Sequence, residues 1–250
     1  MNAPALEVRG VNKRFGALTV ASDISVTLPV GARHALIGPN GAGKTTLVNM
    51  ITGALRPDSG VVSLFGEEIT AQSPARTVPL GLVRTFQITN LFSRLKVWEN
   101  LALAVASRTG ADRNMFRRLW KQSAVLDEAV ALARRVRLAD DLGRNVHELP
   151  YGRQRLVELA MALALKPRVL LLDEPAAGVP SVETHLLLEV LESLPADIAI
   201  LMIDHDMDLV FRYAQRISVL VGGALLTEGT PADIRADERV RDVYLGRRHA

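Results

Sequence analysis

Two hydrophobic patterns along the chain predict two kinds of strand. Apolar and polar residues alternate at positions 6–9 and 24–28, and successive residues of a half-buried strand point to opposite faces. Continuous apolar runs follow at positions 35–37, 169–172 and 198–203. Such runs are typical of parallel strands that are buried on both faces. The pattern therefore predicts an α/β fold in which an antiparallel β start leads into a mostly parallel core sheet.

Helical spacing replaces the strand signals between residues 87 and 149. Apolar residues recur there at intervals of three and four, as one buried face of a helix requires. We interpret residues 88–149 as a helical subdomain inserted in the α/β core, within a single domain of residues 1–250. The spacing and the turn residues predict helices at 44–53, 73–81, 97–106, 125–138, 152–165 and 182–194, a strand at 61–65, and a closing hairpin of residues 217–221 and 225–228.

Composition excludes several classes of protein. The 250 residues are 48% apolar and 23% charged, which is ordinary for a globular chain with a full core. The absence of cysteine excludes disulfides and thiolate metal sites. No apolar run approaches the roughly 20 residues that span a bilayer, and residues 1–14 lack the apolar core of a signal peptide. The net charge of +3 is not clustered, and with 4% aromatic residues we expect no nucleic-acid partner.

One glycine-rich segment fits the phosphate-binding loop pattern, in which two glycines separated by four residues precede Lys and a hydroxyl residue. Small residues let backbone N–H groups point inward, and the helix that follows adds its positive end. Lys44 would contact the β- and γ-phosphates, and Thr45 would hold Mg²⁺. The apolar run before the segment and the helical pattern after it supply the context that an ordinary glycine turn lacks. The predicted nucleotide-binding residues here are Gly38, Pro39, Asn40, Gly41, Ala42, Gly43, Lys44, Thr45 and Thr46.

A second candidate functional element, a pair of acidic residues, follows the apolar run at 169–172. Asp173 and Glu174 come directly after this strand, which is the form of a Walker B element downstream of a phosphate loop. Asp173 would hold Mg²⁺ through water, and Glu174 would orient and deprotonate the attacking water. The alternative is a pair of surface acids at a strand end.

The order of these motifs resembles that of the ATP-binding-cassette (ABC) ATPases. Between phosphate loop and acidic strand lie Gln87 and the segment Leu-Pro-Tyr-Gly-Arg-Gln-Arg at 149–155, and His205 follows a later strand. The resemblance covers residues 6 to 246. It implies that Phe15 stacks on adenine, that Gln87 meets Mg²⁺ and couples to a membrane partner, and that His205 contacts the γ-phosphate. Tyr151 and Gly152 would face the nucleotide of a second subunit.

The resemblance also implies cofactors, partners and location. ATP would bind with Mg²⁺ shared among Thr45, Gln87 and Asp173. A second ABC ATPase, identical or different, and two permease subunits would complete an importer at the cytoplasmic face of the inner (plasma) membrane, supplied by a periplasmic solute-binding protein. The segments at 84–87, 97–101, 173–178 and 229–231 look like those of the ATPases in branched-chain amino-acid uptake systems. Related systems import urea or other small polar solutes with similar ATPases. The alternatives are a soluble non-transport ABC ATPase and a weakly hydrolysing dimerisation module.

Two positions depart from the family pattern. Pro150 stands where a signature serine is usual, and Pro180–Ser181 stands where a polar residue precedes Pro. Proline fits the start of a helix but offers neither hydroxyl nor N–H to a phosphate. Two interpretations remain open: an asymmetric heterodimer in which this chain offers a weakened signature, or a neutral change because backbone N–H groups near Gly152 suffice.

Overall fold

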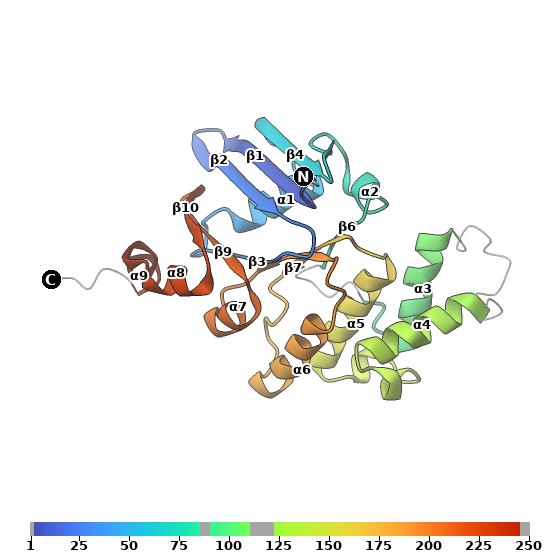
Figure 1. The fold of residues 1–250 in the computed structure, drawn as a ribbon. Coiled ribbons are helices and arrows are strands. Elements are labelled where there is room, and N and C mark those ends of the chain that lie inside the picture. Colours follow the sequence, from blue (N-terminus) through green and yellow to red (C-terminus); the bar gives the residue numbers. More distant parts are fainter. Residues whose placement is uncertain (1–2, 86–90, 111–122, 246–250) are drawn as a thin grey trace. The chain divides into compact units, whose positions relative to one another are not determined.

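The computed structural model describes residues 3–85, 91–110 and 123–245, which form two compact units (Figure 1). The first unit comprises Met1–Leu82, Arg168–Glu174 and Pro195–Ala250, and the second comprises Val83–Pro167 and Pro175–Leu194. The second unit includes the predicted insertion, 88–149, and also the two helices that follow it in sequence. Each unit is described by itself.

An antiparallel sheet in the first unit confirms the alternating pattern at the start of the chain. Leu6 pairs with Leu28 on one neighbouring strand and with Leu64 on the other. The side chains of Leu6, Val8 and Val11 are buried, whereas Arg9 between them is exposed. The strand order is β2-β1-β4-β5, with β1 Leu6–Phe15, β2 Leu18–Leu28, β4 Ser59–Leu64 and β5 Glu67–Glu68.

The second sheet of this unit is mostly parallel, as the continuous apolar runs predict. Every residue of β7 and of β8 is buried. Neighbouring strands run in the order β10-β9-β3-β8-β7, and only the β9–β10 hairpin is antiparallel. The chain leaves the first unit within β6, Leu82–Arg84. The other bounds are β3 Arg33–Ile37, β7 Val169–Asp173, β8 Ala199–Ile203, β9 Arg216–Val221 and β10 Ala224–Gly229.

Helix α1 of the first unit begins and ends where the sequence predicts. It starts at Lys44, and Gly53 follows its last residue in the left-handed conformation. A Cβ at Gly53 would lie 1.9 Å from the Gln72 carbonyl oxygen, so only glycine fits there. The helices of this unit are α1 Lys44–Thr52, α2 Pro74–Thr77, α7 Met207–Tyr213, α8 Pro231–Ala236 and α9 Glu238–Leu245.

The second unit is helical and buries one face of each predicted helix. Val97, Leu101, Ala129 and Leu156 are among its fully buried residues. Two short 3₁₀ turns connect α4 with α5, which lie in the green and yellow part of Figure 1. The bounds are α3 Val97–Thr109, α4 Ser123–Arg135, η3 Ala139–Asp141, η4 Val146–Glu148, α5 Tyr151–Ala164 and α6 Ser181–Glu192.

A buried polar network joins three strands of the first unit. His34 of β3 is 1% exposed, and its Nε2 lies 2.8 Å from the Ser218 hydroxyl. That hydroxyl donates to Glu228 Oε2 at 2.7 Å, so the imidazole Nε2 must carry the hydrogen between His34 and Ser218. Arg216 donates to the other oxygen of Glu228. Burial lowers the pKa of His34, which therefore stays neutral in the folded chain.

The His34→Gln variant tests this network. As the pH is lowered from about 7.5 to 5.5, the unfolded chain protonates His34 before the folded chain does, so the wild-type free energy of unfolding decreases as the pH decreases. Glutamine keeps an N–H donor without a charge, and Glu228, whose pKa is lowered, remains ionised beside Arg216. Urea unfolding at several pH values should show a flatter dependence for the variant. Equal slopes would contradict the assignment.

Candidate functional site

The predicted phosphate loop connects β3 to α1 in a tight backbone turn. The Ala42 N–H donates to the Pro39 carbonyl at 3.1 Å. A Cβ at Gly38 would lie 2.2 Å from the Leu220 carbonyl oxygen, and one at Gly43 would lie 2.6 Å from the Val20 carbonyl oxygen. The two glycines are required because neighbouring strands approach the loop this closely. Thr45 is exposed in the first turn of α1.

The Lys44 ammonium is folded against the loop that precedes it. Nζ donates to the carbonyl oxygens of Gly38 at 2.6 Å and of Pro39 at 3.0 Å. Burial lowers the pKa of Lys44, and the carboxylates of Glu174 and Asp173 act in the opposite direction. The positive charge therefore lies within electrostatic reach of both predicted acids.

The carboxyl ends of three parallel strands bring the acidic residues to the loop. Ile203 is opposite Leu36 on one side and opposite Asp173 on the other. Asp173 is 4% exposed. Glu174 follows it with φ 48°, and its N–H donates to the Ile203 carbonyl at 2.7 Å. A left-handed glutamate is unusual, and such residues concentrate at functional sites.

His205 lies beside Glu174 on a turn that two aspartates shape. Its Nδ1 is 3.6 Å from Glu174 Oε1, and its side chain is 62% exposed. Asp204 Oδ1 accepts the N–H groups of His205 and Asp206 at 2.7 and 2.9 Å. Asp206 in turn accepts two N–H groups at the start of α7. Burial raises the pKa of Asp204, a residue that sequence reasoning missed because a single acid carries no motif.

Two further site predictions have different outcomes. Phe15 at the end of β1 is 52% exposed, and Lys13 Nζ lies 5.6 Å from its ring centroid, so the ring is available to a ligand and is not core. Gln87 lies outside the described residues.

Sequence reasoning also missed Tyr244 of α9. Burial raises the pKa of its hydroxyl to about 12, and the Gly38 backbone acts against that rise.

The signature segment opens α5 in the second unit. Pro150 precedes the helix in an extended conformation and supplies no side-chain cap. The Gly152 N–H donates to Glu183 Oε2 of α6 at 2.9 Å. Tyr151 is 38% exposed, and its hydroxyl accepts a hydrogen bond from Arg155 at 2.6 Å. Sequence reasoning did not anticipate the partner of Gly152.

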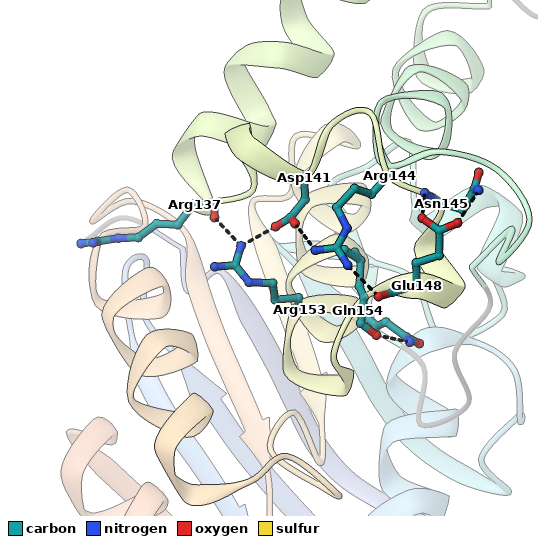
Figure 2. Close-up of polar contacts among 8 residues, drawn as sticks. Arg137, Asp141, Arg144, Asn145, Glu148, Arg153 and Gln154 are labelled. Carbon is teal, nitrogen blue, oxygen red and sulfur yellow. Dashed lines mark hydrogen bonds and ion pairs between the residues drawn. The ribbon is translucent and has the colours of Figure 1, made fainter.

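A buried aspartate fixes the signature segment to the 3₁₀ turns. Figure 2 shows Asp141 between two arginines, accepting from Arg153 of the signature and, at 3.1 Å, from Arg144. Arg144 also donates to the Glu148 carbonyl at 2.9 Å. The Asp141 side chain is 6% exposed, whereas both arginines reach solvent. The carboxylate is therefore compensated by two charges and anchors the start of α5.

Comparisons with known proteins identify the class. Residues 21–177 match the family model described as ABC transporter. The chain therefore belongs to the ABC transporter family, and it is an ATP-hydrolysing subunit of that family. Residues 224–250 also match a model described as branched-chain amino acid ATP-binding cassette transporter. Among the described residues, no helix combines the length and apolar character that a membrane span needs.

Individual relatives agree over nearly the full length. The chain is 36% identical to the high-affinity branched-chain amino acid transport ATP-binding protein BraF of Pseudomonas aeruginosa and 38% identical to LivG of Escherichia coli K12, covering 98% of this chain and 99% of each relative. The crystal structure of the ADP conformation of an ABC transporter cassette superposes with a TM-score of 0.86 at 30% identity, covering 97% of this chain and 99% of that one. These matches confirm the predicted family and α/β ABC fold.

Asp141→Ala should destabilise the second unit. The substitution leaves two arginines without their buried counter-charge, which costs about 2 kcal/mol when the arginines are partly exposed. Denaturant unfolding measures the loss. Asp140→Ala is the matched control, because Asp140 is the exposed neighbour in the same turn, and it should change stability by less than about 0.5 kcal/mol. Equal effects of the two variants would rule out the anchoring role.

Proposed function

We propose that this ATPase energises the import of branched-chain amino acids or a related small polar solute. The observation that carries the proposal is the full-length similarity to BraF and LivG, together with the matching C-terminal segment 224–250. Both relatives are named for high-affinity transport of branched-chain amino acids. The ATPase itself needs no contact with the solute, so the solute is proposed from similarity and not from a pocket.

ATP is proposed to bind along the phosphate loop with adenine on the Phe15 ring. The N–H groups at the start of α1 and its positive end suit the phosphates. On binding, the Lys44 ammonium exchanges the carbonyl oxygens of Gly38 and Pro39 for the more strongly negative phosphate oxygens. The remaining loop residues, Asn40, Gly41, Ala42, Gly43 and Thr46, complete the cradle.

The residues present fit Mg²⁺, which prefers oxygen ligands and keeps several waters. The Thr45 hydroxyl, next to Lys44 in sequence, and the buried Asp173 carboxylate are the proposed oxygen ligands, and Gln87 completes the proposed set. Among the described residues, no group of three or more His, Cys, Asp or Glu side chains forms a metal site. Bound Mg²⁺ would neutralise phosphate charge.

Glu174 and His205 are proposed to carry the hydrolysis step. Glu174 orients the attacking water and takes its proton, and its left-handed backbone holds the carboxylate at the strand end. His205 lies 3.6 Å from that carboxylate and would contact the γ-phosphate. The exposure of His205 leaves it accessible to the nucleotide.

Glu174→Gln tests both the chemistry and the transport proposal. The amide keeps the shape of the side chain but cannot accept the proton, so turnover should fall about 100-fold or more while ATP still binds. Cells that carry the variant should lose uptake of labelled leucine, isoleucine and valine. Glu68→Gln, on exposed β5, is the control and should retain both activities. Wild-type turnover in Glu174→Gln would reject the base, and unchanged branched-chain uptake would reject the solute class.

The proposed partners are a second ABC ATPase and two permease subunits, with a periplasmic solute-binding protein, at the cytoplasmic face of the plasma membrane. A pocket of about 440 Å³ in the second unit supports a docking contact. Phe92 at its edge is 54% exposed, which suits an apolar segment of a permease. The pocket is lined by Val83, Arg84, Thr85, Leu91, Phe92, Leu103, Ala104, Ser107, Glu158, Met161, Ala162 and Leu165.

Ser107→Arg should block this pocket. Ser107 is an exposed lining residue of α3, so a long charged side chain there would fill the pocket without disturbing the core. Co-purification with the permease subunits from membranes should fall, while ATP binding by the isolated chain stays unchanged. Thr109→Arg, two residues further along and outside the lining, should leave assembly intact. Normal assembly of Ser107→Arg would remove the pocket as the docking site.

A further inference from the structure

Two neighbouring helices of the second unit begin without a side-chain cap. Pro150 precedes α5 and Pro180 precedes α6, and neither contributes a side-chain hydrogen bond to its helix. A helix start leaves several backbone N–H groups without an intrahelical partner and carries a partial positive charge. Serine or aspartate usually meets this need, but a proline side chain has no acceptor.

One carboxylate takes the place of the missing caps. Glu183 lies in the first turn of α6, and its Oε2 accepts the Gly152 N–H of α5 at 2.9 Å. A Cβ on Gly152 would lie 2.1 Å from that oxygen, so the carboxylate sits directly over the glycine backbone. The glutamate thus places a negative charge at the positive ends of both helices, where such charges are favourable.

A second anion would compete for the Gly152 N–H. Under the proposed function, on which this inference rests, the Gly152 N–H faces the γ-phosphate of ATP held by the second ATPase. A single N–H makes one strong hydrogen bond, and two anions at one helix end repel each other. We propose that Glu183 is an internal anion that holds the signature amide in the nucleotide-free chain, and that the partner's γ-phosphate must displace it when the dimer closes.

This competition makes Glu183 a residue that sets the ATP requirement of the transporter. Pro150 has removed the hydroxyl that would otherwise help the phosphate, so the outcome depends on the Gly152 amide more than it would with serine. If Glu183 only capped the helices, its loss would have the opposite effect on the ATP dependence. The signature segment would then be less well ordered, and closure of the ATPase dimer would be weaker. The two roles therefore predict opposite changes in the ATP dependence.

The test compares wild type, Glu183→Gln and Glu192→Gln in the assembled transporter. ATP hydrolysis is measured over a range of ATP concentrations. Glutamine keeps an acceptor oxygen for Gly152 but removes the charge, so the KM for ATP should fall about tenfold, which corresponds to about 1.4 kcal/mol, without a loss of kcat. Glu192 is exposed at the far end of the same helix, and its variant should match wild type.

An unchanged or higher KM in Glu183→Gln would overturn the proposal and leave Glu183 as a helix cap. Glu183→Asp is the second variant, for use if the first does not fold: it keeps the charge in α6 but draws the carboxylate back from Gly152, and it should also lower the KM. Absence of ATP hydrolysis in the wild-type complex would instead contradict the proposed function. If the wild-type complex is active and the KM of Glu183→Gln for ATP is unaltered, only the proposed competition between Glu183 and the γ-phosphate is contradicted.

Discussion

The parallel register of β3, β7 and β8 is the constraint on which the candidate site depends. Because Ile203 is opposite both Leu36 and Asp173, the strand ends stop at one level. Each strand then continues into a different chemical element: the phosphate loop, the acidic pair, and the turn that carries His205. No residue of the three elements is near another in sequence. The buried apolar strands thus determine the distances among the phosphate loop, the acidic pair and the turn that carries His205.

Both halves of the proposed nucleotide site hold a substitute charge from the chain itself. In the first unit the Lys44 ammonium is bonded to carbonyl oxygens of its own loop. In the second unit the Glu183 carboxylate is bonded to an amide of the signature. A cation is thus held where the phosphates of this chain's own nucleotide would bind, and an anion is held where the γ-phosphate of the partner's nucleotide would bind. Lys44 and Glu183 therefore each have a hydrogen-bonding partner within the chain in the absence of nucleotide.

Local pattern predicted the parts of the fold that depend on local sequence. Four features could be predicted because each combines residue type with spacing: strand alternation, the apolar runs, the glycine loop and the acidic strand end. The order of the motifs indicated the family. The contacts that pattern could not supply join distant or unremarkable residues. Gly152 and Glu183 are 31 positions apart, and the His34 network depends on the pairing of strands. Asp204 is a lone acid whose importance appears only when its backbone partners are placed.

Helix α5 is a rigid connection between the signature segment and the pocket of the second unit. Its first turn carries the signature, tied by Arg153 to Asp141, and its later turns carry Glu158, Met161 and Ala162 of the pocket lining. With 14 residues it is a rod of about 21 Å. A displacement at the signature end would therefore reach the pocket end as a rigid translation or tilt. Under the proposed function, the length of this one helix would set the distance between the nucleotide contact and the permease contact.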